Sequence, residues 1–365
     1  MLPLILAAVL IHPVRSFTVA ADSTPGRVSF AHDDQYEYLA TPVGLMRSRR
    51  LADPAEPAEV VAFDGRRVND VASNGRFLYV LLGNGIFGTS PDSTLLRSGD
   101  HGHTFSPIDT RLAECRGARC EYLVGHHVEI AGGRVVVELG GNVLVTPDEG
   151  LHWYQLYGSV TKGVPDLQIC PVVFTVGGST LYLGGECPLD SGWIGGGTLT
   201  ADGLSWLSPP TRVVPHLDLG NRNVQFIRVG SDMFAGIEGA LIRGTSFTIF
   251  YDLGAQRYPY IRQFVEWSKN PFIRLAGGFD KVDESGFLAF SGGPGPGALP
   301  PDILPFLPIV WEDVSAALPA GTTNVAMLAE AADGTLLIAT QNGWRYTVGT
   351  IELTSSSSKR RAARH

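Results

Sequence analysis

The segment that decides the fold reads SGDHGHTF over residues 98–105. It ends a short apolar stretch, and its last residue is an aromatic that opens the next stretch. The aspartate carboxylate can accept hydrogen bonds from backbone N–H groups across a tight turn, and the glycine can adopt the positive φ that such a turn needs. The segment therefore predicts a hairpin turn whose aromatic residue packs beneath a sheet.

The same pattern occurs twice more in the chain. Residues 146–153 read TPDEGLHW, and residues 200–206 read TADGLSW, which is one residue shorter. The residues predicted to build the three turns are Ser98, Asp100, Gly102 and Phe105, then Thr146, Asp148, Gly150 and Trp153, and finally Thr200, Asp202 and Trp206. Three copies within hairpin patterns favour a fold made of repeated units.

These segments resemble the Asp-box of the BNR-repeat β-propellers, whose pattern is S/T-x-D-x-G-x-T-W/F. The resemblance extends over residues 27–353, although only the middle third of the chain carries recognisable motifs. The superfamily includes sialidases, sortilin-type receptors and photosystem II assembly factor-like propellers. The resemblance thus implies a propeller, but no single chemistry.

A blade pattern repeats around the motifs and predicts an all-β propeller of four-stranded blades. The predicted second strands are Tyr36–Ala40, Phe77–Leu82, Val135–Leu139, Thr180–Gly184, Met233–Gly236, Phe272–Ala276 and Leu336–Thr340. They indicate seven blades, or six if the unit at 272–314 is an elaborated insertion. Residues 292–308 are rich in Pro and Gly and predict a long loop in the sixth blade. We expect residues 17–21 to close the ring as an outer strand beside the last blade.

Composition agrees with one large β domain. The 365 residues include 44 Gly and 24 Pro and only 18% charged residues, which suits short strands and tight turns. A formal charge of −8 argues against nucleic-acid binding, because phosphates require a basic surface. We expect the propeller to occupy residues 17–354 as a monomer, followed by a disordered basic tail at 355–365.

The N-terminus predicts export. Residues 1–11 form an apolar run too short to span a bilayer, and Val14 and Ser16 suit a cleavage site. We predict a signal peptide over 1–16 and a secreted or periplasmic protein; a buried first strand is the alternative. No other segment is apolar enough to cross a membrane.

The four cysteines point to the same compartment. Cys115 lies five residues before Cys120, and Cys170 lies one hairpin before Cys187, so that two local disulfides are expected. A zinc site is the rival interpretation, but the sequence has no CxxC and no suitably spaced His. No metal or cofactor is predicted.

The candidate site lies on the face opposite the Asp-box turns, where the connections after second strands and between blades meet. Its candidate ligand-binding residues are Arg116, Arg119, Glu186, Asp190, Trp193, Asp280 and Asp283, carried by loops that include residues 186–197 and 279–286. Trp193 could stack on a sugar, carboxylates could bind hydroxyls, and arginines could bind an acidic sugar. His101 and His103 are better explained as turn residues than as a metal pair. His126 and His127 fall in an inner strand of the third blade, where one should line the channel.

Two functions from different classes remain open. The preferred one is a secreted, non-catalytic propeller that binds a glycan or an extracellular or cell-surface protein. The alternative is a sialidase-like glycoside hydrolase of the exo-α-sialidase type. Its relatives use an arginine triad, a Tyr nucleophile helped by Glu, and an Asp acid/base.

The sequence lacks the main motif that the hydrolase alternative would require. The F/Y-R-I-P motif of sialidases is absent, and the nearest candidate catalytic group is Arg257, Tyr258, Tyr260, Arg262 and Glu266. An assembly-factor role is a third possibility, but it would need a basic patch, which the overall acidity does not favour.

Overall fold

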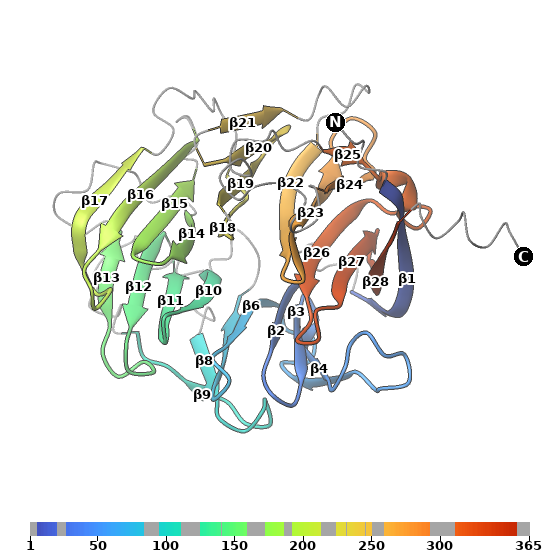
Figure 1. Ribbon diagram of the computed structural model, residues 1–365. Helices are drawn as coiled ribbons and strands as arrows, with labels where there is room; N and C mark the ends of the chain where they lie inside the picture. The colour runs from blue at the N-terminus through green and yellow to red at the C-terminus, as the bar shows by residue number, and fades with distance from the viewer. Residues whose placement is uncertain are drawn as a thin grey trace, which may run out of the picture.

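The protein is described from a computed structural model over residues 6–19, 27–83, 95–110, 125–139, 141–158, 172–185, 192–212, 224–230, 232–244, 246–249, 259–292 and 311–355. These residues form seven antiparallel sheets of four strands each. The sheets are arranged as blades around a central channel (Figure 1). The chain is therefore a seven-bladed β-propeller, which confirms the predicted fold class and decides between seven blades and six.

The strands follow one another from the channel outwards in each blade. Blade 1 comprises β2 (Ser29–His32), β3 (Glu37–Thr41), β4 (Gly44–Ser48) and β5 (Glu59–Ala62); blade 2 comprises β6 (Val68–Ser73), β7 (Leu78–Leu82), β8 (Leu95–Ser98) and β9 (Ser106–Pro107). Blade 3 comprises β10 (Gly125–Ala131), β11 (Arg134–Leu139), β12 (Asn142–Thr146) and β13 (Tyr154–Tyr157); blade 4 comprises β14 (Val172–Gly177), β15 (Thr180–Gly185), β16 (Trp193–Leu199) and β17 (Trp206–Arg212). Blade 5 comprises β18 (Phe226–Val229), β19 (Met233–Ile237), β20 (Ala240–Arg243) and β21 (Ser246–Ile249); blade 6 comprises β22 (Pro259–Trp267), β23 (Asn270–Asp280), β24 (Gly286–Ser291) and β25 (Glu312–Asp313). Blade 7 comprises β26 (Asn324–Glu330), β27 (Leu336–Asn342), β28 (Arg345–Ser355) and β1 (Leu6–Thr18).

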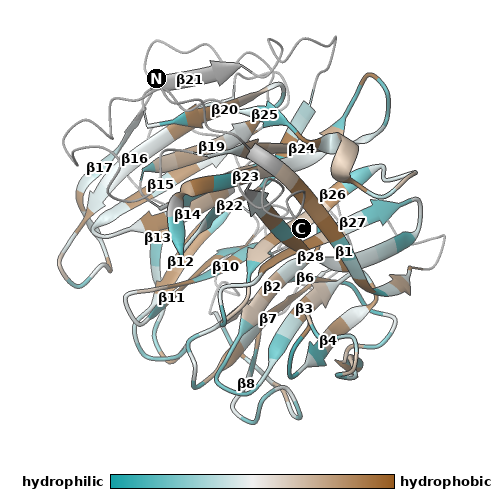
Figure 2. Ribbon diagram, turned by 45° about the vertical axis from the view of Figure 1, so that its right-hand side comes forward, coloured by the Kyte–Doolittle hydropathy of each residue, from teal (hydrophilic) through white to brown (hydrophobic). Residues whose placement is uncertain are grey.

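Each predicted second strand is found, because its residues are packed on both sides by neighbouring blades. The strands β3, β7 and β19 are buried at every position, which explains the continuous apolar sequences of β7 and β19. Figure 2 shows apolar residues along the strands, for example in β28. The unit at residues 272–314, which would be an insertion in a six-bladed ring, contains β23. This is a regular second strand paired with both β22 and β24.

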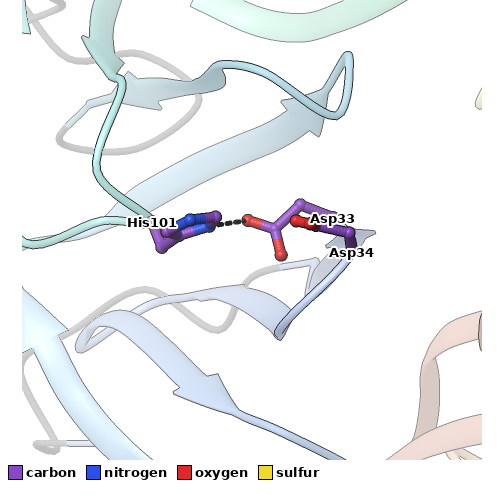
Figure 3. A group of neighbouring side chains, drawn as sticks. All are labelled: Asp33, Asp34 and His101. Carbon is purple, nitrogen blue, oxygen red and sulfur yellow. Dashed lines mark hydrogen bonds and ion pairs between the residues drawn. The ribbon is translucent and has the colours of Figure 1, made fainter.

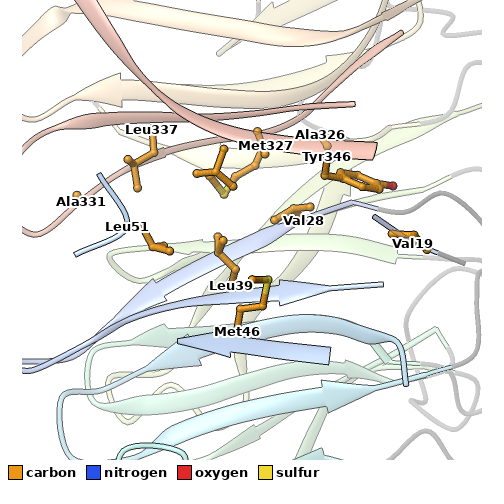
Figure 4. Packing of buried hydrophobic residues seen from close by; sticks show 12 residues of the cluster. Val19, Val28, Leu39, Met46, Leu51, Ala326, Met327, Ala331, Leu337 and Tyr346 are labelled. Atoms are coloured by element: carbon orange, nitrogen blue, oxygen red, sulfur yellow. The ribbon is translucent and has the colours of Figure 1, made fainter. Parts of the chain in front are cut away.

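The hydrophobic core is divided among the contacts between blades. Figure 4 shows the cluster between blades 7 and 1, where Leu39 and Met46 face Met327 and Leu337. Leu39 and Leu337 are completely buried. Because each cluster joins two blades, the apolar side chains hold neighbouring blades together as well as individual sheets.

The ring is closed by an N-terminal strand that is longer than predicted. In place of residues 17–21, β1 spans Leu6–Thr18 and pairs antiparallel with β28 (Figure 1). Val9 is 6% exposed, and Phe17 stacks on Tyr346 with ring centroids 5.2 Å apart. The apolar N-terminal run therefore has a place in blade 7. Removal of residues 1–16 would leave only two residues of β1.

The first two predicted turns have one hydrogen-bonding scheme, whereas in the shorter third turn Asp202 accepts from the N–H of Leu204 and Thr200 Oγ1 from the N–H of Ser205. In the first, Asp100 Oδ1 accepts from the backbone N–H of Thr104 at 2.8 Å, and Ser98 Oγ accepts from the N–H of Gly102 at 2.8 Å. The central glycines have positive φ, 82° at Gly102, 99° at Gly150 and 68° at Gly203. The aromatic residues Phe105, Trp153 and Trp206 pack against the blade cores. We call residues 98–105, 146–153 and 200–206 the aspartate turns.

One predicted loop is partly a strand. Residues 193–197 were expected in the connection at 186–197, but Trp193–Leu199 forms β16. Glycine is needed within this strand, because a Cβ on Gly197 would lie 2.5 Å from the indole of Trp206 and 2.8 Å from the carbonyl oxygen of Ser208. The run of three glycines at 195–197 permits close packing against β17.

Helix is rare among the described residues. They include the short 3₁₀ helix η4 (Ser315–Ala317). No helix in the described part of the chain is long and apolar enough to cross a membrane.

Candidate functional site

The blade topology separates two faces of the ring. Each blade is antiparallel, so the connections from first to second strand and from third to fourth strand lie on one face, together with the aspartate turns. We call this the turn face. The connections from second to third strand and from blade to blade lie on the opposite face, which we call the loop face. The innermost strands run from the loop face to the turn face and line the channel.

A cavity of about 150 Å³ lies in the channel between the inner strands of blades 1, 5, 6 and 7. Its lining residues are Arg27, Val28, Ser29, Phe30, Phe226, Arg228, Arg262, Gln263, Phe264, Met327, Leu328 and Ala329. Three of these residues are arginines, and none of the described residues that line the cavity is acidic. The cavity is thus a pocket of concentrated positive charge.

Two of these arginines have few partners. No hydrogen bond or ion pair joins Arg27 or Arg262 to another described side chain, and Arg27 Nε is buried without a partner in the described part of the chain. Arg228 Nη1 lies 3.4 Å from His127 Nε2. The guanidinium N–H groups of Arg27 and Arg262 are therefore available to an anion.

Burial sets the electrostatics of the arginines. It lowers the pKa of Arg27; Asp70 opposes this effect and Arg228 adds to it. Burial also lowers the pKa of Arg262, and Tyr260 and Glu238 oppose the change. By its accessible surface Arg262 is nevertheless exposed, so the effect of burial on it is weaker than on Arg27. Because arginine stays protonated at neutral pH, each lowered pKa reflects a charge that an anion would stabilise.

The channel wall beside the cavity is fixed by a buried carboxylate. Asp70 Oδ2 lies 2.6 Å from His127 Nδ1 and accepts the backbone N–H of Val128 at 3.0 Å. Ser29 Oγ donates to the other oxygen of Asp70. Burial alone would raise the pKa of Asp70, but the charge and hydrogen bond of His127 lower it. These contacts tie blades 1, 2 and 3 together, and they place His127 in the channel wall, as predicted.

The predicted catalytic group is not assembled among its described members. Tyr260 and Arg262 are near one another on β22, but Glu266 lies six residues further along the strand than Tyr260. At about 3.3 Å per residue, roughly 20 Å of strand separates Tyr260 from Glu266. Glu266 Oε2 instead accepts from Arg274 Nε at 2.9 Å. Arg257 and Tyr258 lie outside the described residues.

The candidate ligand-binding residues that the structure describes make contacts that stabilise the fold. Asp280 accepts the N–H of Val282 at 2.9 Å, and Asp283 accepts the N–H of Ser285 at 3.1 Å, so both carboxylates order the turn between β23 and β24. Trp193 is 8% exposed and lies 6.0 Å from the ring of Tyr157. Arg116, Arg119, Glu186, Asp190, Cys115, Cys120, Cys170 and Cys187 lie outside the described residues.

A histidine on the turn face joins blades 1 and 2. His101 Nδ1 lies 2.9 Å from Asp33 Oδ2, beside Asp34 (Figure 3), and His101 Nε2 lies 3.1 Å from Gln35 Nε2. Asp33 also accepts the phenolic hydrogen of Tyr38 at 2.6 Å. Both ring nitrogens of His101 and the carboxylate of Asp33 thus make contacts between blades 1 and 2.

Sequence reasoning missed Arg27 and Arg228. The available signal was an arginine within a short apolar inner strand, as in the FIRV of β18. A charged side chain on an inner strand must either find a partner between blades, as Asp70 does, or reach the channel. The sequence does not show which inner strands line the same cavity, and the site depends on this.

Comparison with known proteins shows the fold. No protein-family model matches the sequence, and no curated protein sequence matches it. The structure is similar to YCF48 from Cyanidioschyzon merolae, with a TM-score of 0.59, 14% identity and coverage of 94% of this chain and 98% of that one. It is also similar to an ancestral GH74 enzyme, with a TM-score of 0.58, 11% identity and coverage of 95% and 52%. A third similar structure is the extracellular domain assigned to a hybrid two component system from B. thetaiotaomicron, with a TM-score of 0.56, 11% identity and coverage of 94% and 40%. At these identities the similarities establish the propeller fold alone.

Proposed function

We propose that the protein is a non-catalytic propeller that binds an acidic glycan, with the acidic group held in the channel cavity. The observation that carries this proposal is the convergence of Arg27, Arg228 and Arg262 on one cavity without an acidic lining residue among the described ones. Arginine presents N–H donors in a planar fork that matches a carboxylate. A cluster of like charges is stabilised when an anion enters it.

The dimensions favour a terminal group over a whole ligand. Pockets for drug-sized ligands measure about 300–1,000 Å³, whereas this cavity measures about 150 Å³. One acidic group would occupy the cavity while the rest of the ligand contacts the loop face. The predicted binding residues Arg116, Arg119, Glu186 and Asp190 would then contribute from their loops.

The charge distribution favours a compact acidic ligand. The whole chain carries a formal charge of −8, so the positive cavity is a local exception and not part of a general basic surface. Such a site suits a compact anion better than nucleic acid, which needs an extended series of cations. An acidic segment of a partner protein could present the same group, and the experiment below separates the two sources.

The surroundings of the candidate nucleophile bear on whether binding is followed by bond cleavage. Burial raises the pKa of Tyr260, the hydrogen bond to Glu238 raises it further, and Lys281 opposes the change. A Tyr nucleophile needs a lowered pKa or an adjacent base, and the hydrogen-bonded carboxylate of Glu238 is the one group beside Tyr260 that could act as such a base among the described residues. Glu266 is held by Arg274 well away from Tyr260. The sialidase-like hydrolase remains the second candidate, because converging arginines are also what its substrate carboxylate would require.

Family and localisation complete the proposal. The aspartate turns have the residues and hydrogen bonds expected of Asp-box repeats, which supports membership in that superfamily. Export to the periplasm or the exterior rests on the apolar N-terminus and the two predicted cysteine pairs. Because β1 contains most of the predicted signal peptide, the mass of the mature N-terminus tests this part.

The proposal is tested with an array of neutral, uronic, sulfated and sialylated glycans, scored for retained protein and for loss of terminal sugars. We expect retention on acidic glycans without trimming. Loss of terminal sugars would establish the hydrolase alternative instead. Equal retention on neutral glycans would contradict the role of the arginines, and absence of retention would direct the search to acidic protein partners.

A further inference from the structure

Arg262 occupies an irregular position on its strand. The pairing of β22 with β23 shifts between Ile261 and Gln263, so that Arg262 is the extra residue of a β-bulge. A Cβ on Gly278 would overlap the carbonyl oxygen of Tyr260, which shows that the bulge requires glycine on the facing strand. A bulge redirects the side chain that it carries. Here the redirected side chain is one of the three arginines of the cavity.

An aromatic ring, and not a carboxylate, holds the redirected side chain. The guanidinium carbon of Arg262 lies 4.6 Å from the ring centroid of Phe279. Phe279 is cross-strand partner to Tyr260, and their rings stack at 4.7 Å with an interplanar angle of 12°. Lys281 Nζ in turn donates to the hydroxyl of Tyr260 at 3.0 Å.

This arrangement has a consequence for anion binding. A carboxylate partner would position an arginine but would also neutralise it and use its N–H donors. A cation–π contact positions the guanidinium through its face and leaves the in-plane N–H groups available. We propose that Phe279, supported by Tyr260, is a positioning residue that holds Arg262 ready for the acidic group of the ligand. This inference rests on the proposed function of the same cavity.

The experiment compares variants by calorimetric titration with galacturonic acid, with galactose as the uncharged control ligand. Phe279→Leu keeps an apolar side chain but removes the aromatic face, whereas Phe279→Tyr keeps the face. Phe272→Leu makes the same change on the same strand near its other end, and no contact to a cavity arginine is found for Phe272 among the described residues. Melting temperatures of all variants report structural damage separately from affinity.

We expect Phe279→Leu to weaken galacturonic acid binding by about three- to tenfold, the size that a cation–π contact accounts for. Phe279→Tyr should restore wild-type affinity, and Phe272→Leu should leave it unchanged. In an Arg262→Gln background, Phe279→Leu should have no further effect, because the side chain that it positions is gone. If Phe279→Leu does not fold, Phe279→Met provides the same comparison.

Two failures are distinguishable. If the wild-type protein does not bind galacturonic acid, the proposed function is wrong. If the wild type binds and Arg262→Gln weakens binding, but Phe279→Leu binds as the wild type does, the positioning role is wrong. The role is equally wrong if Phe279→Tyr loses as much affinity as Phe279→Leu, or if the loss persists in the Arg262→Gln background.

Discussion

Arg97, on the third strand of blade 2, donates a hydrogen bond from Nη1 to the carbonyl oxygen of Glu149 at 2.8 Å. The same contact occurs one blade earlier, where Arg47 Nη1 donates to the carbonyl oxygen of His101 at 2.7 Å. Each acceptor directly follows the aspartate of its turn and has positive φ, 64° at Glu149 and 56° at His101. An arginine of one blade thus binds the aspartate turn of the next blade.

Arg47→Ala should destabilise the propeller, because the Arg47 side chain is 7% exposed and also pairs with Glu59 at 2.9 Å. Hydrogen bonds to charged groups contribute about 1.5–3 kcal/mol, so we expect a loss of about 2 kcal/mol in the free energy of unfolding. Urea denaturation measures it. Arg49→Ala, at an exposed position two residues away, should change stability by less than about 0.5 kcal/mol. Equal effects of the two variants would refute the contact between blades.

Asp100→Ala should remove the hydrogen bonds that order its turn. The carboxylate accepts from the N–H and the hydroxyl of Thr104, at 2.8 and 2.6 Å, and from Ser98 at 2.7 Å. Because the turn is exposed, we expect a loss of about 1–2 kcal/mol in the free energy of unfolding, with ligand affinity unchanged. Asp64→Ala, in another exposed turn, is the control. An unchanged melting temperature in Asp100→Ala would contradict the structural role of the turn.

Asp148 should make the protein sensitive to acid. The hydrogen bonds from the side chain and backbone of His152 lower the pKa of Asp148 from 3.8 to about 2. A lowered pKa in the folded state stabilises the fold above the unfolded-state pKa, and this contribution is lost as the pH falls through the folded value. We expect stability to decline between pH 4 and pH 2, measured by thermal unfolding at each pH. Asp148→Asn should show a shallower decline, and an identical pH profile would count against this assignment.

Deletion of residues 1–16 should destabilise blade 7. The deletion removes Val9, which is 6% exposed, and breaks most of the pairing between β1 and β28. Since burial of one large apolar side chain contributes about 1.5–3 kcal/mol, the melting temperature should fall by several degrees. Deletion of residues 356–365, which follow β28, is the control. If the variant that begins at Phe17 had the same melting temperature as the full-length chain, β1 would be dispensable for stability.

The fold could be predicted from the sequence because its units repeat. The SGDHGHTF segment and its two copies mark turns whose Asp and Ser or Thr side chains bond to residues of the same turn. The second strands show their burial directly as apolar runs. The errors came from positions governed by distant contacts. Residues 193–197 are a strand because Trp206 packs against Gly197, and β1 extends to Leu6 because β28 is there to pair with it.

The candidate site was much less predictable. Tyr260, Arg262 and Glu266 are close in sequence, but an extended strand separates the first from the last. Arg27 and Arg228 are 201 positions apart in the printed sequence, and they meet because blades 1 and 5 both face the channel. No local sequence pattern indicates that the two arginines converge, whereas the residues of each aspartate turn lie within eight positions of sequence.

The central claim is that the channel arginines bind an acidic group, and calorimetric titration with galacturonic acid and galactose tests it most directly. The two sugars share a ring and differ in one carboxylate, so their difference in affinity isolates the charge. We predict binding of galacturonic acid but not galactose by the wild type, and its loss in the double variant Arg27→Gln/Arg262→Gln at unchanged melting temperature. Equal affinity for the two sugars, or undiminished binding by a folded double variant, would contradict the claim.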